Sequence, residues 1–471
     1  MITAFTGATV IDAVGQPRPA GVVLVEDGLI LAAGAAQAVP VPSEAEVIDL
    51  TGKFLLPGFI DGNVHLVPWP SWTYIEFLAR YEDRMHEVAI EAAQIALAAG
   101  FTTVFDSMGP LDSLIEARSE IESGRAPGAR MFVAGDIVGF RAVFTTVASM
   151  ASASTAFQRR INDRFEAGAG PELSWMSPSQ IFDVMTRYAE SGVDFVKYGA
   201  TGDGAPLNSE IGQDAVLRFS PDQQRAIVDA VHAAGLTVQT HTTSAESLHI
   251  AVEVGNDMGQ HAAHTGASRI YDSTIERMLE RGYSCGTQWG PLTEDELRMI
   301  AVRDFPGAER VGRDGADFSL ENAVRLIEAG VPQLVTTDAG TIDADVALDA
   351  HQWGGLGGKA SLIGEAEFQN IQGMADRGMS PMQIIQAATI NVARAYRVHD
   401  RVGSIEPGKV ADLVVLDRDP LIDSAHLRSV SRVIQSGRVI DRGSLPARRV
   451  LTVDETDSSG KYPIRRTRGT A

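Results

Sequence analysis

The middle of the chain, residues 58–400, alternates short apolar runs with longer stretches of helical pattern. Helical stretches at 87–99, 221–234 and 245–254 each precede or follow an apolar run, and such runs occupy 102–105, 130–134, 194–197, 236–240 and 333–337. This alternation is typical of parallel strands covered by helices, and it predicts a (β/α)₈ TIM barrel in an α/β protein. A doubly wound open sheet is the rival fold. It is disfavoured because no Gly-x-Gly-x-x-Gly turn follows the first strand of this region.

The two ends of the chain have a different pattern. Residues 8–12, 21–25, 29–33 and 45–49 are short pieces rich in β-branched residues and separated by Gly, Pro and Asp turns, and residues 413–417 and 431–440 repeat this style. We therefore expect a small β-sandwich domain assembled from both termini. The predicted organisation is a first sandwich part at 1–57, the barrel at 58–400, and a second sandwich part with a C-terminal tail at 401–471.

Charge and cysteine content exclude several classes of function. The chain has 61 acidic and 40 basic residues, a net charge of −21, which disfavours nucleic acid and anionic membranes as partners. Cys285 is the single cysteine, so an intrachain disulfide and a cysteine-based zinc site are both excluded. The N-terminus lacks a basic segment followed by an apolar core, and no apolar run reaches the roughly 18 residues of a membrane span. The expectation is a cytoplasmic enzyme.

Polar residues end the apolar runs, where a parallel barrel carries its catalytic side chains. Taken in chain order, the residues at these strand ends are Asp61, Asn63, His65, Lys197, His241, His261 and Asp338. Imidazole and carboxylate are standard ligands of zinc-like ions, so the set predicts a metal site. Each residue also has an ordinary interpretation, such as half of an ion pair for Lys197 or a helix N-cap for Asp338.

The order of these residues resembles that of the amidohydrolase superfamily. Residues 56–66 (LPGFIDGNVHL) look like its first-strand motif, and similar matches follow at Lys197, at His241, at residues 255–261 (GNDMGQH) and at Asp338. The resemblance implies one or two divalent ions (Zn²⁺, or Co²⁺, Mn²⁺ or Fe²⁺) and a carboxylated Lys197 that bridges them. It also implies a homo-oligomer. The spacing from Gly255 favours His261 over His264 as the ligand.

Asn63 departs from the family pattern, which has histidine at this position of a His-x-His pair. Either the site holds a single tight metal with Asn63 as a hydrogen-bonding neighbour, or the weaker amide oxygen of Asn63 binds a second, looser metal. An Asn-x-His pair resembles the subgroup of the molinate (thiocarbamate) and phenylurea hydrolases.

The resemblance implies hydrolysis of a C–N or C–S bond in a small apolar thiocarbamate, phenylurea, carbamate or amide, by attack of metal-bound hydroxide on the carbonyl. Asp338 would carry the proton, and Tyr198 or His241 would polarise the carbonyl. Aromatic residues in the expected loops (Trp69, Trp72, Tyr74, Phe140, Phe144 and Trp289) suit an apolar ring. The alternatives are an amidohydrolase acting on a dipeptide, N-acyl amino acid or cyclic amide, and a non-catalytic scaffold barrel.

Overall fold

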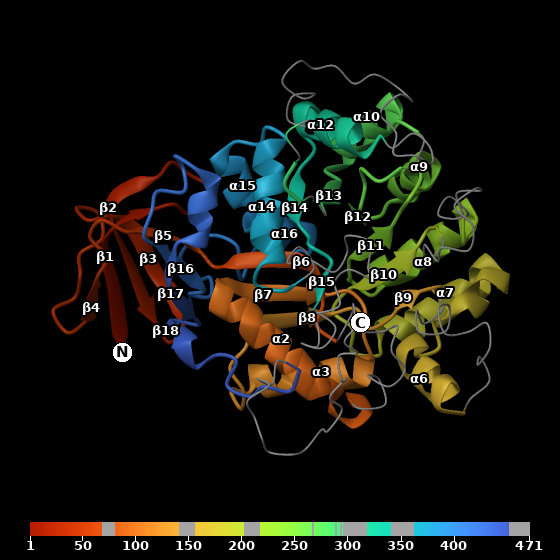
Figure 1. Cartoon of the computed structure of the whole chain (residues 1–471), viewed down its shortest axis with the longest axis horizontal. Coiled ribbons are helices and arrows are strands. Elements are labelled where there is room, and N and C mark those ends of the chain that lie inside the picture. Colours follow the sequence, from red (N-terminus) through yellow and green to blue (C-terminus); the bar gives the residue numbers. More distant parts are fainter. Residues whose placement is uncertain are drawn as a thin grey trace, which may run out of the picture.

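The structure is a computed structural model, and it describes residues 1–67, 81–140, 156–201, 217–265, 268–287, 290–292, 294, 318–340 and 362–451. Strands from the two ends of the chain lie together at one side of the molecule, and the alternating strands and helices form the rest (Figure 1).

The terminal strands form one hydrogen-bonded sheet of eight strands in the order β18-β17-β16-β5-β1-β2-β3, with β4 paired to β1. β5 pairs antiparallel with β16 and so joins the two ends of the chain. The strands are β1 (Ile2–Val10), β2 (Arg18–Glu26), β3 (Leu29–Ala35), β4 (Glu46–Asp49), β5 (Phe54–Pro57), β16 (Leu413–Leu416), β17 (Val430–Gln435) and β18 (Arg438–Val439).

This sheet differs from the two separate sheets of the expected sandwich. β1 is nine residues long and pairs first with β4 and then with β5 along the same edge, which keeps both strands in one sheet. The sheet curls so that Leu29 of β3 bridges to Val410, just before β16. Side chains from β1, β2, β3, β5, β16 and β17 share one apolar core inside the curl.

The middle of the chain forms two parallel sheets, with orders β15-β6-β7-β8 and β14-β13-β12-β11-β10-β9. All residues of β6 and β7 are buried, as expected for parallel strands covered on both faces. The strands are β6 (Phe59–His65), β7 (Phe101–Asp106), β8 (Arg130–Val133), β9 (Ile137–Val138), β10 (Val196–Gly199), β11 (Val238–His241), β12 (Met258–Gln260), β13 (Ser284–Thr287), β14 (Gln333–Val335) and β15 (Ala339–Gly340).

The hydrogen-bond ladders of these two sheets do not join into the single closed ring that we expected. The breaks fall where three residues separate β8 from β9 and where three separate β14 from β15. The two sheets nevertheless face a common polar interior. Ser107, just after β7, donates to Gln239 of β11 at 2.9 Å, and Gln239 donates to the backbone oxygen of Gly62 in β6 at 3.5 Å.

Helices surround these strands on the outside (Figure 1). Three begin with the same local sequence, Ser-Pro-x-Gln, in which the serine and glutamine form a reciprocal capping box and proline occupies the first turn. The α-helices are α2 (Met85–Ala99), α3 (Leu111–Glu122), α6 (Ala156–Glu166), α7 (Pro178–Ala189), α8 (Pro221–Ala233), α9 (Ala245–Val254), α10 (Asp272–Arg281), α12 (Ser319–Ala329), α14 (Ala366–Asp376), α15 (Pro381–Ala387) and α16 (Ile390–Ala395). Short 3₁₀ helices are η1 (Glu82–Arg84), η2 (Pro171–Trp175), η7 (Ser424–Arg428) and η8 (Arg442–Ser444).

The expected helices at 87–99, 221–234 and 245–254 are confirmed as α2, α8 and α9, and each expected apolar run of the middle region overlaps a strand. In the part of the chain that the structure describes, no helix has both the length and the apolar character needed to cross a membrane.

Candidate active site

The metal ligands that we predicted lie in parallel strands or directly after them. Asn63 and His65 end β6, Lys197 lies in β10 and His241 ends β11. His261 follows β12, and Asp338 lies between β14 and β15. Asn63, His65, Lys197 and His261 are buried, and His241 and Asp338 are half-buried. Since parallel strands of a barrel end at the same face, this placement brings distant parts of the sequence to one region.

A chain of hydrogen bonds joins four of these residues. Lys197 Nζ donates to Asn63 Oδ1 at 3.2 Å, and Asn63 Nδ2 donates to Asp338 Oδ1 at 2.9 Å. The same Asp338 oxygen lies 2.8 Å from His65 Nε2. The backbone reinforces the link, because Asp338 N donates to the carbonyl oxygen of Asn63 at 2.8 Å. The carboxylate of Asp338 is therefore the centre of the group.

His241 and His261 complete the cluster. Their ring centroids lie 5.2 Å apart, with the rings inclined by 73°. His261 also interacts electrostatically with Asp338 and Lys197. The five predicted ligands that follow the family pattern, together with Asn63, thus form one connected group.

Two members of the cluster have backbone conformations that non-glycine residues rarely adopt. The φ angles of His261 and Asp338 are +55° and +58°, in the left-handed region. Strain of this kind is concentrated at functional sites, where the surrounding structure holds the side chain in a required direction. In Asp338 the hydrogen bonds to Asn63 and His65 provide that support.

Burial and neighbouring charges set the protonation of the cluster. Burial holds the pKa of His65 below its usual range and that of His261 well below it, so both imidazoles are neutral at pH 7. Burial also lowers the pKa of Lys197. Burial would raise the pKa of Asp338, but the hydrogen bond with His65 and the charge of Lys197 outweigh burial and hold that pKa well below its usual range. Asp338 is therefore the ionised acid of the cluster.

This donor set fits a divalent metal ion. Metal ligands must be deprotonated, and neutral imidazoles beside an ionised carboxylate meet that condition. In addition, Nδ1 of His261 is a buried atom without a hydrogen-bond partner among the described residues. A buried polar atom of this kind requires an explanation, and coordination would supply one.

The structure does not bring Tyr198, which we predicted to be catalytic, to this cluster. Its hydroxyl group donates to Gln224 of α8 at 2.8 Å and accepts from Asn256 at 2.9 Å. Successive residues of a strand point to opposite faces, so Lys197 faces the interior while Tyr198 faces the surrounding helices.

Some of the other histidines and aromatic residues lie beside the cluster, and others do not. His264 lies beside His261 with ring centroids 6.2 Å apart, whereas His249 bonds to Thr274 of α10 at 2.9 Å. Phe140 is buried, and its ring lies at 76° to that of His241, at a centroid distance of 5.2 Å. Trp69, Trp72, Tyr74, Phe144 and Trp289 lie outside the described residues.

Asp106, which we did not select from the sequence, is a buried carboxyl group beside the cluster. It accepts hydrogen bonds from Leu66 N at 2.7 Å and Met108 N at 3.1 Å. Burial raises its pKa to about 8, and the charge of Lys197 acts in the opposite direction. Asp106 directly follows the apolar run 102–105, so the rule that selected the other strand-end residues would also have selected it.

Asp61 ties together the two segments that carry Asn63 and Asp338. Its carboxylate accepts from Asn63 N at 3.0 Å, from Thr337 N at 3.2 Å and from Thr337 Oγ1 at 2.6 Å.

We expect Asp61→Ala to lower the free energy of unfolding by roughly 2–5 kcal/mol, because it leaves buried donors without acceptors. Urea titration measures this change. Asp61→Asn keeps one acceptor oxygen and should lose less; equal losses in the two variants would contradict this account.

Comparisons with known proteins identify the family to which this chain belongs. A solved structure of molinate hydrolase is 37% identical, with a TM-score of 0.85, and the match covers 99% of this chain and 98% of that one. A solved structure of phenylurea hydrolase B is 35% identical, with a TM-score of 0.86, and the match covers 96% and 100%. The imidazolonepropionase of Geobacillus sp. (strain WCH70) is 24% identical over 89% of this chain and 90% of that protein.

The match to the amidohydrolase family extends over residues 54–440 and includes every residue of the cluster. The resemblance that the motifs indicated is therefore confirmed, and the chain belongs to the amidohydrolase family.

Proposed function

We propose that this protein hydrolyses a C–N or C–S bond in a small apolar thiocarbamate, phenylurea, carbamate or amide. One observation carries the proposal: Asn63 takes the place of the first histidine and bridges Lys197 to Asp338. The likeness to molinate hydrolase and phenylurea hydrolase B, at 35–37% identity over nearly the whole chain, supports the same substrate class.

In this proposal His65, His241, His261, Asp338 and a carboxylated Lys197 hold one or two divalent ions. Such an ion, when bound, supplies a water of lowered pKa and polarises the substrate carbonyl. The lowered pKa of Lys197 matters here, because only a neutral amine can take up CO₂ to form a carbamate. The carbamate would bring a negative charge among the neutral imidazoles.

Asp338 moves the proton. Because it is ionised, it can accept a proton from the attacking water and pass it to the departing nitrogen or sulfur. The oxygen of the water bonds to the carbonyl carbon, the C–N or C–S bond breaks, and the amine or thiol leaves with the transferred proton. Asn63 orients this carboxylate through its amide N–H group, and we assign it this role in preference to that of a metal ligand.

Phe140 is suited to contact an apolar part of the substrate. Its ring lies against His241, and a side chain on Gly199 of β10 would collide with it, since a Cβ atom there would lie 1.9 Å from Phe140 Cε1. The glycine therefore makes room for this aromatic residue beside the cluster.

A second candidate function is hydrolysis of a natural cyclic amide. The support for it is similarity to the imidazolonepropionases. The three matches from Geobacillus are 24–26% identical over about nine tenths of the chain. Imidazolone propionate carries a carboxylate, so this function requires a cationic residue beside the cluster. We assign this part to Arg218, whose guanidinium lies 5.7 Å from the centroid of the Phe140 ring.

A substrate panel separates the two candidates. The purified, metal-analysed protein is incubated with phenylureas, thiocarbamates, carbamates, N-acyl amino acids, dipeptides and imidazolone propionate, and the products are identified by mass spectrometry. We expect turnover of the first three classes. Turnover confined to the carboxylate-bearing compounds would overturn the proposal, and Arg218→Gln would then be expected to raise KM for them.

A further inference from the structure

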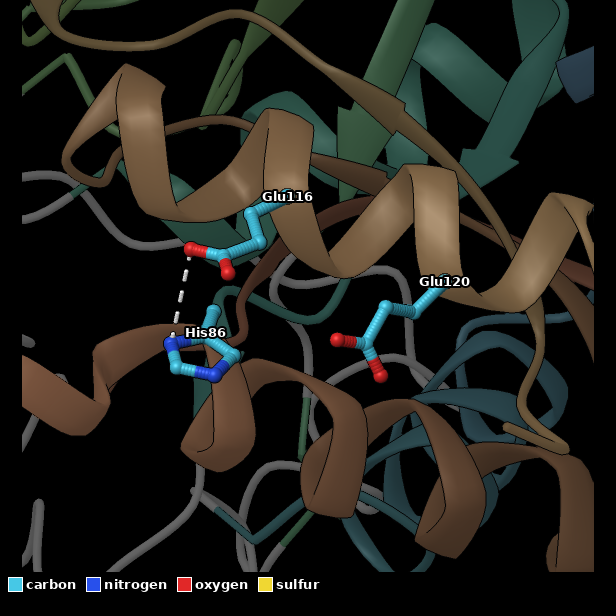
Figure 2. Close-up of side chains that lie close together, drawn as sticks. All are labelled: His86, Glu116 and Glu120. Carbon is cyan, nitrogen blue, oxygen red and sulfur yellow. Dashed lines mark ion pairs between the residues drawn. The ribbon is translucent and has the colours of Figure 1, made fainter. Parts of the chain in front are cut away.

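A second group of metal-ligating side chains lies between α2 and α3. It consists of His86 in the first turn of α2 and of Glu116 and Glu120 of α3, and we call it the α2–α3 triad. Both glutamate side chains extend from α3 toward α2 (Figure 2). One ligand atom of each residue lies within 4.8 Å of the other two, and no other His, Asp or Glu grouping in the described residues is as close.

The local sequence places these ligands on one helix face. Glu116 and Glu120 are four residues apart in α3, so their side chains are neighbours on the same side of the helix. His86 approaches from the helix packed alongside, and its Nδ1 lies 3.6 Å from Glu116 Oε2. Two ligands of a tetrahedral zinc ion, each about 2.0–2.2 Å from the metal, lie roughly 3.4 Å apart. The 3.6 Å between His86 and Glu116 is close to this value, and the ligand atom of Glu120 lies within 4.8 Å of both.

The charges of the triad favour a cation. Among the ion pairs of the described residues, Glu116 pairs with His86, and neither Glu116 nor Glu120 pairs with an arginine or lysine. The neighbouring arginines are engaged elsewhere, Arg118 with Asp194 and Arg84 with Glu87. Like charges four residues apart destabilise a helix by a few tenths of a kcal/mol, and a bound cation would remove this repulsion.

We propose that the α2–α3 triad is a binding site for a zinc-like divalent ion, separate from the active-site cluster. One imidazole and two carboxylates are ligands of Zn²⁺ and its transition-metal neighbours, whereas Mg²⁺ and Ca²⁺ take oxygen ligands. Three protein ligands leave a fourth position for water. The ion holds the first turn of α2 to α3, and so connects the helix that follows β6 to the helix that follows β7.

The test compares Zn²⁺ binding by the holoprotein before and after the triad is altered. The protein is loaded with its active-site metal, freed of excess metal and titrated with Zn²⁺ by calorimetry, with bound zinc counted by mass spectrometry. We expect one further Zn²⁺ per chain in the wild type and its loss in His86→Gln and in Glu120→Gln. At a free Zn²⁺ concentration 100 times the Kd, the folding equilibrium should shift by about 100-fold toward the native state.

Two matched variants serve as controls. Glu122→Gln removes the same charge from the opposite side of α3, and His399→Gln removes an exposed histidine, so both should still bind the additional ion. An excess of Mg²⁺ should not displace it. The proposal is overturned if the triad variants and the wild type bind the same amount of zinc. It is also overturned if either control variant loses the ion, since binding would then depend on general surface charge.

Discussion

Asp338→Asn is expected to retain the active-site metal and to lose turnover by roughly 10²–10⁴-fold, the usual contribution of a positioned general acid–base group. Asparagine keeps the shape of the side chain and an oxygen that can accept from His65 and Asn63, but it cannot accept a proton. The measurements are kcat on the best substrate of the panel and the metal content of the purified variant.

The matched control for this change is Asp400→Asn, which removes a carboxylate from an exposed turn after α16. It should leave kcat unaltered. If Asp338→Asn kept the wild-type kcat with its full metal content, Asp338 could not be the proton carrier, and the proposed mechanism would have to be abandoned.

Lys197→Met is expected to lose bound metal and to lower kcat/KM by at least about 100-fold. Mutating a residue that only supports a metal ligand typically lowers metal affinity or activity by about 10–100-fold. The loss of a ligand itself should therefore cost at least the upper end of that range. The reason lies in the burial of Lys197, which lowers its pKa and so favours the neutral amine that a carbamate requires. Methionine fills a similar volume without an amine.

Carboxylation of Lys197 has its own measurement, independent of activity. After exchange with ¹³C-labelled bicarbonate, the wild-type protein should show a carbamate carbon in its NMR spectrum, and Lys197→Met should not. Lys53→Met, which changes an exposed lysine paired with Asp417, should keep this signal. A fully active, metal-loaded wild type without the signal would refute the carbamate while leaving the histidine ligands in place.

The predicted secondary structure was confirmed where the local signals are strong. α9 begins at Ala245 and ends at Val254 as expected, because Ser244 caps its start and Gly255 adopts a left-handed conformation at its end. The arrangement of sheets was harder to predict. The break between β8 and β9 and the continuous curl of the terminal sheet depend on pairing between distant strands, and no local pattern encodes that pairing.

The active site shows the same division between local and tertiary information. The strand-end rule selected His65, Lys197, His241, His261 and Asp338, and the structure brings them together because parallel strands end at one face. We also selected Tyr198 because it adjoins Lys197. Side chains alternate along a strand, so Tyr198 points away from the cluster and its hydroxyl group donates to Gln224. Asp106 could have been found by the same rule, whereas the triple acceptor role of Asp61 could not.

By itself, the sequence determined the family, the alternating strands and helices, and the identity of the residues at the strand ends, because these properties follow from local composition and spacing. Tertiary structure alone decided that Asn63 bridges Lys197 to Asp338, across 134 and 275 residues of sequence. It also decided that His86 meets Glu116 between two helices. Contacts of this kind depend on how strands and helices pack. A pattern along the sequence does not show which distant side chains will face one another.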